Sequence, residues 1–255
     1  MSQRSSLFGL EFDALRMDEV LQRCRETSQG NGRIEIGVAN AAKVIRMRRD
    51  PQLMDAVVSS DLLLADGMSI VWASRILGQA LPERVAGIDL FEALLRDAEQ
   101  HQLGVYFLGA TDEVLERMVQ VIQERHPRLK ITGFRNGYYS PNEESAVAET
   151  IKASRPNYLF LGMTSPKKEL FLAKWSEEIG ANVTHGVGGS FDVIAGKVKR
   201  APRLMQRLGL EWFYRLAQEP RRMFGRYAVT NTLFLGLVLR ELLSGRRPAA
   251  SRQEN

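Results

Sequence analysis

Short apolar runs alternate with stretches of helical period between residues 34 and 188. The runs are IEIGVA (34–39), DLLLA (61–65), GVYFLG (104–109), KITGF (130–134), YLFLGM (158–163) and VTHGVG (183–188). Such short, largely apolar runs are typical of parallel strands that are buried on both faces. The stretches between them are amphipathic, as in 112–126, where Val114, Leu115, Met118, Val119 and Ile122 share one helical face. This alternation predicts a doubly wound, mostly parallel, Rossmann-like α/β sheet.

Polar and glycine-rich residues follow the predicted strands, at the sheet edge where ligands bind in such folds. Asn40 follows the first run, and Asp66 with Gly67 follows the second. Asp66 is therefore placed as an active-site residue or as a helix cap, and the pattern leaves both interpretations open. The later strand ends supply further candidate ligand-binding residues, namely Gly109, Tyr138, Gly162, Lys168, Glu169, Gly186, Gly188, Gly189, Ser190 and Asp192.

The segment GVGGSFD indicates a close approach between backbone and ligand, because glycine has no Cβ. It lacks the third glycine of a dinucleotide fingerprint and follows the last predicted strand, so a tight structural turn is the alternative. The three histidines are scattered and Asp-x-Asp is absent, so we expect no metal site and no cofactor. His185 lies within a predicted strand and is interpreted as a hydrogen-bonded buried side chain.

Charge divides the chain at residue 196. Residues 1–196 hold 22 Lys and Arg against 26 Asp and Glu, a net of −4, whereas residues 197–255 hold 13 against 4, a net of +9. We expect an α/β catalytic domain at 1–196 and a basic, amphipathic helical appendage at 197–255. The basic segment favours nucleic acid, a phosphorylated substrate or an acidic membrane surface as partner, with a merely soluble tail as the alternative.

The C-terminal segment also contains an apolar helical stretch. Only 13 residues separate Arg226 from Arg240, short of the ~20 that span a bilayer. A basic and apolar helix of this length is typical of one lying in a membrane interface. A buried terminal helix or an oligomer contact is the alternative.

The combination AN, DG, ERVAGIDL, RNGYY, GMTSPKKE, GVGGSFDVIAGKVKRAP and EWFYRLAQEPRR resembles the bacterial WecG/TagA/CpsF glycosyltransferases over about residues 8–240. The resemblance implies an inverting, metal-independent transfer from a UDP-sugar donor to an undecaprenyl-diphosphate-linked sugar, in the synthesis of exopolysaccharide or another cell-surface polysaccharide. It implies that Asp66 is the base, that Asn40 and Arg84 belong to the catalytic set, and that Arg215, Arg222 and Arg226 bind the lipid diphosphate. The strand-end candidates would then bind the nucleotide sugar.

Two positions depart from the family pattern: Val38 stands for a threonine and Lys168 for a glutamine. An ammonium in place of an amide changes charge and hydrogen bonding.

The expected partners are the donor, the polyprenyl-linked acceptor and an anionic membrane surface rather than nucleic acid, with a homo-oligomer left open. The N-terminus shows no signal-peptide core, so we expect a cytoplasmic protein attached peripherally to the plasma membrane. The alternatives are a Rossmann-type oxidoreductase or methyltransferase and a non-catalytic membrane adaptor.

Overall fold

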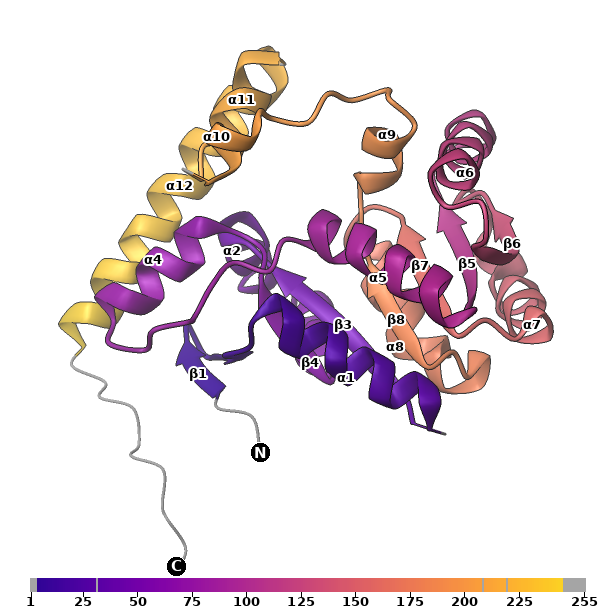
Figure 1. The fold of residues 1–255 in the computed structure, drawn as a ribbon. Coiled ribbons are helices and arrows are strands. Elements are labelled where there is room, and N and C mark those ends of the chain that lie inside the picture. The colour runs from indigo at the N-terminus through magenta and orange to yellow at the C-terminus, as the bar shows by residue number, and fades with distance from the viewer. Residues whose placement is uncertain (1–3, 31, 208, 219, 245–255) are drawn as a thin grey trace, which may run out of the picture.

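A computed structural model describes residues 4–30, 32–207, 209–218 and 220–244 (Figure 1). Its centre is a six-stranded sheet in the order β4-β3-β8-β7-β5-β6, in which every pair of neighbours is parallel. The strands are β3 (Ile34–Ala39), β4 (Leu62–Ala65), β5 (Gly104–Gly109), β6 (Lys130–Arg135), β7 (Tyr158–Gly162) and β8 (Val183–Gly186). The predicted α/β fold is confirmed, with strand ends that differ from the sequence prediction by no more than two residues.

Helices cover both faces of this sheet. They are α1 (Met17–Gln29), α2 (Ala41–Met47), α3 (Pro51–Val58), α4 (Met68–Ile76), α5 (Gly87–His101), α6 (Asp112–Arg125), α7 (Glu144–Ser154, after the short helix η1 at Pro141–Glu143), α8 (Lys167–Ile179) and α9 (Ser190–Ile194). Alternate strand residues point to opposite faces. Phe107 and Phe160 pack in one core with α1, α5 and α6, whereas Leu108 and Leu161 pack in another with α7 and α8.

An antiparallel hairpin that the sequence analysis did not predict precedes the sheet. Its strands are β1 (Arg4–Leu7) and β2 (Leu10–Asp13), and both turn residues have positive φ, 61° at Phe8 and 78° at Gly9. The buried Asp13 accepts a hydrogen bond of 3.0 Å from the backbone N–H of Leu63 in β4. This bond attaches the hairpin to the edge of the sheet.

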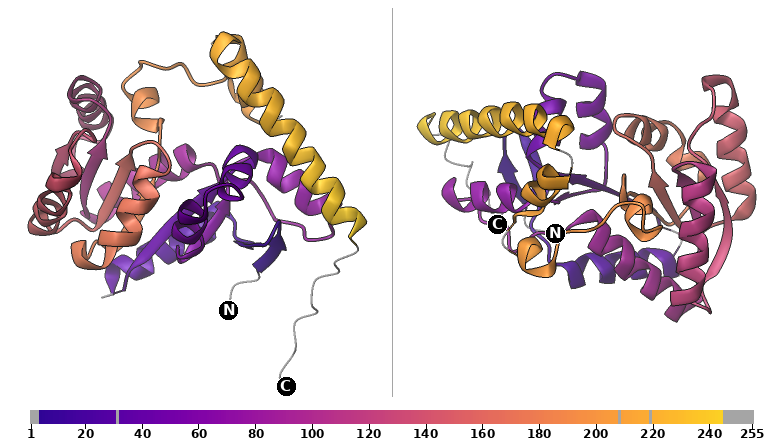
Figure 2. Two further views of the ribbon diagram at one scale, coloured as in Figure 1. Left: turned by 180° about the vertical axis from the view of Figure 1, so that it is seen from behind. Right: turned by 90° about the horizontal axis from the view of Figure 1, so that it is seen from above.

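The C-terminal segment forms α10 (Arg203–Arg207), α11 (Glu211–Gln218) and α12 (Pro220–Leu243). Figures 1 and 2 show α12 as a long helix at the end of the molecule opposite α6 and β6. Within the described ranges, no helix is both long enough and apolar enough to span a bilayer. Proline is favourable at the first helical position, which explains why α12 begins at Pro220.

The last turns of α12 pack against the N-terminal hairpin. Phe234 and Val238 are buried in the same core as Phe8, and the rings of Phe8 and Phe234 meet edge to face at 5.2 Å. The Glu241 carboxylate accepts hydrogen bonds of 3.0 and 3.1 Å from the Phe8 N–H. Other positions of α12 are exposed, namely Phe224, Val229, Leu235, Leu239, Leu242 and Leu243. The division at residue 196 stays a prediction, although α12 contributes to the core that the hairpin belongs to.

We expect Phe234→Ala to lower the free energy of unfolding by about 3 kcal/mol, because a buried aromatic side chain is lost and a cavity remains. Leu239→Ala on the exposed side of the same helix is the control and should change the free energy by less than about 0.5 kcal/mol. Urea denaturation followed by circular dichroism measures both. An equal change in the free energy of unfolding for the two variants would contradict the packing of α12 on the hairpin.

Candidate active site

Asp66 and Asn40 lie side by side at the carboxyl edge of the sheet, as the sequence predicted. Strands β4 and β3 are in register from Ile36 opposite Leu62 to Ala39 opposite Ala65, so the next residue of each strand reaches the same edge. The side-chain Nδ2 of Asn40 is 3.4 Å from Oδ2 of Asp66. Asn40 also caps α2, because its Oδ1 accepts a hydrogen bond from the Lys43 N–H.

The Asp66 carboxylate is fixed by a helix other than the one that follows it. The N-cap of α4 is Gly67, whereas Oδ1 of Asp66 accepts a hydrogen bond of 2.9 Å from the N–H of Gly87, the first residue of α5. The positive end of the α5 dipole therefore faces this carboxylate. The helix-cap interpretation is therefore wrong for the helix that follows Asp66, and Oδ2 has only the long contact to Asn40 among the hydrogen bonds of the described residues.

His185 supports the backbone that binds Asp66. It is fully buried in β8, with Nε2 3.1 Å from the Gly87 carbonyl and Nδ1 3.4 Å from the Ile36 carbonyl. Burial lowers the pKa of His185, and a neutral imidazole donates to one of the two carbonyls. The predicted role as a hydrogen-bonded buried histidine is confirmed. His185 therefore has a structural role, because it holds the start of α5 against β8.

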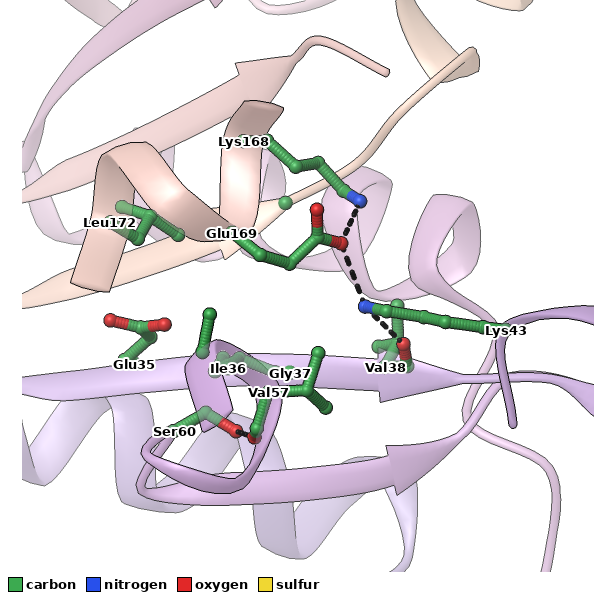
Figure 3. A pocket seen from close by; sticks show the side chains of 12 residues that line it. Glu35, Ile36, Gly37, Val38, Lys43, Val57, Ser60, Lys168, Glu169 and Leu172 are labelled. Carbon is green, nitrogen blue, oxygen red and sulfur yellow. Dashed lines mark hydrogen bonds and ion pairs between the residues drawn. The ribbon is translucent and has the colours of Figure 1, made fainter. Parts of the chain in front are cut away.

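Lys43, Glu169 and Lys168 form a chain of charged side chains beside this edge, of which Glu169 and Lys168 are buried and Lys43 is 12% exposed (Figure 3). Oε1 of Glu169 accepts from Nζ of Lys43 at 2.8 Å and from Nζ of Lys168, and Lys43 also donates to the Val38 carbonyl at 3.0 Å. The cavity next to them holds about 20 Å³, space for a single water molecule. Lys168 and Glu169, both predicted to bind the nucleotide sugar, thus contact each other beneath the sheet edge.

Burial and neighbouring charge shift the pKa values in this chain. Burial, followed by repulsion from Lys43, lowers the pKa of Lys168 to about 8. Burial opposes ionisation of Glu169, but the ammonium groups of Lys43 and Lys168 outweigh it and lower its pKa to about 2. Near pH 7 the Lys43–Glu169–Lys168 chain therefore holds two ammonium groups and one carboxylate. The surplus positive charge lies close enough to Asp66 to interact with it.

The backbone next to Arg84 lies at the same edge of the sheet, because the N–H of Val85 donates a hydrogen bond to the carbonyl of Ala65 at the end of β4. Its guanidinium is 3.4 Å from the Asp89 carboxylate and 3.0 Å from the Glu211 carboxylate of α11. Arg200 pairs with Asp89 at 2.5 Å. The backbone beside Arg84 thus meets the end of β4, next to Asp66, while the guanidinium contacts the C-terminal segment.

The glycines of the predicted ligand loops differ in their surroundings. A Cβ on Gly188, where φ is +54°, or on Gly189 would meet no atom within 4 Å, so this turn borders open space. A Cβ on Gly186 would come within 2.9 Å of the Lys168 side chain. The Ser190 hydroxyl donates to the Val187 carbonyl, and the Asp192 carbonyl accepts from Lys197 and Val198. Gly188 and Gly189 therefore leave the most room for a ligand.

Packing accounts for two other predicted glycines. A Cβ on Gly162 would lie 2.2 Å from the Phe191 ring, and one on Gly109 would lie 2.5 Å from the Gly162 backbone. Tyr138 is exposed in the loop after β6, at the edge of the sheet opposite β4. Ligand contacts of these residues stay predictions. The side chains of Arg215, Arg222 and Arg226 lie outside the described part of the structure, although their backbone belongs to α11 and α12.

The sequence analysis overlooked Lys43, Arg200 and Glu211. Lys43 lies three residues after Asn40 in the first turn of α2, a spacing that could have placed it near the same edge. No sequence signal pairs Glu211 with Arg84, because their contact joins the loop before α5 to α11. Among the described residues, no group of three or more His, Cys, Asp or Glu side chains is arranged to hold a metal ion.

Comparisons with known proteins identify relatives that match this chain over most of its length. A protein of Bacillus spizizenii named N-acetylglucosaminyldiphosphoundecaprenol N-acetyl-beta-D-mannosaminyltransferase is 36% identical over 187 residues, 73% of this chain and 72% of the relative. A Staphylococcus aureus protein of the same name is 31% identical over 219 residues, 85% of each chain. The model of the glycosyl transferase WecG/TagA/CpsF family matches residues 5–248. The chain is therefore a glycosyltransferase and belongs to the WecG/TagA/CpsF family.

Proposed function

We propose that this enzyme transfers a sugar from a UDP-sugar to an undecaprenyl-diphosphate-linked sugar, with inversion and without a metal ion. The names of the relatives support an acceptor that ends in N-acetylglucosamine and make N-acetylmannosamine the first donor sugar to test. The observation that carries the chemistry is the Asp66 carboxylate, which Gly87 orients at the carboxyl edge of the sheet.

Asp66 acts as the general base in this proposal. As the acceptor hydroxyl oxygen forms a bond to the anomeric carbon, its proton passes to Oδ2 of Asp66, and the bond between that carbon and the UDP oxygen breaks. The electron pair of the broken bond leaves with the UDP diphosphate, so attack from the opposite face inverts the anomeric centre. An ionised carboxylate suffices as base because the hydroxyl becomes acidic only as the new bond forms.

Positive side chains stabilise the departing diphosphate. Arg84 lies at the same edge, and the largely buried Lys43–Glu169–Lys168 chain carries surplus positive charge next to it. Fixed cations that face developing negative charge lower the barrier without reorganising in the reaction. Arg215, Arg222 and Arg226 would add to this field from the C-terminal segment and bind the lipid diphosphate. Arginine and lysine therefore take the role that a divalent cation has in metal-dependent transferases.

The C-terminal segment attaches the enzyme to the membrane surface in this proposal. Its net charge of +9 favours anionic lipid, and the exposed side of α12 presents Leu235, Leu239 and Leu242. Another side of the same helix is buried, which leaves the exposed side chains free to enter the interface. This arrangement brings a lipid-linked acceptor to the edge that holds Asp66.

The proposed reaction is tested with purified protein, a panel of UDP-sugars, a short-chain polyprenyl-diphosphate N-acetylglucosamine acceptor and EDTA. We expect transfer of one sugar, identified by mass spectrometry, to proceed in the presence of the chelator. Transfer that stops with EDTA and returns with Mg²⁺ or Mn²⁺ would contradict the role given to the cationic side chains.

Asp66→Asn should lower kcat by roughly 10²–10⁴-fold, the range for loss of a general base. The amide oxygen still accepts the Gly87 N–H, so UDP binding and the melting temperature should stay near wild type. Asp55→Asn, on an exposed position of α3, is the matched control and should keep full activity. Near-normal turnover of the Asp66 variant would leave that residue with a structural role only.

The pH dependence should report on Lys168. As the pH rises through about 8, Lys168 loses its proton, the site loses positive charge and kcat/KM for the anionic donor falls. Lys168→Gln should lack this alkaline limb. Burial, followed by repulsion from Asp61, raises the pKa of Glu35 to about 7, so Glu35→Gln is the control that separates its titration from that of Lys168. Superimposable profiles for wild type and Lys168→Gln above pH 7 refute the assignment.

Membrane attachment is tested by co-sedimentation with anionic liposomes. Leu235→Gln with Leu239→Gln should reduce bound protein several-fold, and high salt should release wild type because the attraction is screened. Val58→Gln, at an exposed apolar position of α3, is the matched control. These point variants test membrane binding more directly than a deletion at residue 196 does, because the deletion would also remove Phe234 from the core. Equal sedimentation of all forms excludes docking through α12.

A further inference from the structure

A second polar cavity lies between α4, α5 and α10. It holds about 320 Å³ and is lined by Met68, Arg84, Asp89, Arg203 and Gln206. Met68 comes two residues after Asp66, and Arg84 and Asp89 flank the Gly87 whose N–H binds Asp66. The cavity is therefore lined by residues close in sequence to Asp66 and to the Gly87 that orients it.

The arginines that line or border this cavity differ in whether they form ion pairs. Asp89 contacts both Arg84 and Arg200, and Glu211 accepts from Arg84, so two carboxylates balance two guanidinium groups. Arg203 lines the same cavity, is exposed, and forms no ion pair with another described residue. Gln206 lies one turn further along α10, and its amide donates to the Ala201 carbonyl at 2.6 Å. Among the described residues that line the cavity, Arg203 is consequently the arginine without a carboxylate partner.

We propose that this cavity binds the diphosphate of the lipid-linked acceptor and that Arg203 is its principal contact. The inference rests on the proposed function and adds a binding residue to it. A guanidinium presents paired N–H donors that match phosphate oxygens, and it keeps its charge at any physiological pH. Diphosphate is common to the donor and the acceptor. The acceptor is favoured because α10 also exposes Leu204, next to Arg203, and belongs to the segment whose apolar side chains face solvent.

Steady-state kinetics with both substrates test the assignment. Arg203→Ala should raise KM for the polyprenyl-diphosphate acceptor about 10- to 100-fold, the usual effect of losing a charge-assisted hydrogen bond, and leave KM for the UDP-sugar unchanged. Arg203→Lys should fall between wild type and the alanine variant. Arg117→Ala on the exposed side of α6 is the matched control and should behave as wild type. Equal melting temperatures show that the fold is retained.

Calorimetric binding of inorganic pyrophosphate separates failure of this inference from failure of the proposed reaction, because it needs no turnover. Wild type and Arg117→Ala should bind pyrophosphate more tightly than Arg203→Ala does. Equal affinity in all forms, or an unchanged KM for the acceptor, overturns the cavity as a diphosphate site. A higher KM for the UDP-sugar alone assigns the diphosphate to the donor and overturns the acceptor assignment.

Discussion

The hydrogen bond from the Gly87 N–H to Asp66 is the contact on which the site depends. It joins the end of β4 to the first residue of α5. The carbonyl of that same residue contacts His185 of β8. Gly87 packs close to both strands, because a Cβ there would lie at van der Waals distance from Val38 (3.6 Å) and His185 (3.7 Å). A displaced α5 would move Asp66, Arg84 and Asp89 together. The orientation of the proposed base is therefore built into the packing of a long helix on the sheet.

The largely buried Lys43–Glu169–Lys168 chain is harder to justify by stability. Removing charges from water costs several kcal/mol per ion, and an apolar replacement of a buried ion pair is often neutral or stabilising. Here two ammonium groups share one carboxylate oxygen, while Oε2 of Glu169 lacks a hydrogen-bond partner among the described residues. An arrangement that is unfavourable for folding yet adjoins the reactive edge is consistent with an electrostatic role in binding an anionic substrate.

The sequence predicted the sheet because parallel strands buried on both faces are continuous apolar runs, as in residues 104–109. It also predicted that Asp66 and Asn40 meet, since topology alone brings adjacent strand ends together. It did not predict the N-terminal hairpin, whose turn at Phe8 requires a positive φ that a phenylalanine rarely adopts. Nor did it predict that Lys168 is buried or that Glu211 reaches Arg84, because both depend on helices packing across the fold.

The C-terminal segment is connected to the site through charge as well as through the core that Phe234 and Val238 share with Ala39 and Ala65. Glu211 of α11 and Arg200 reach Arg84 and Asp89, which flank the Gly87 that fixes Asp66. A diphosphate that binds Arg203 in the adjacent cavity adds negative charge beside these pairs and competes with Glu211 and Asp89 for the guanidinium groups. Acceptor binding and the position of α11 would then be linked, because Arg84 both contacts Glu211 of α11 and lines the cavity.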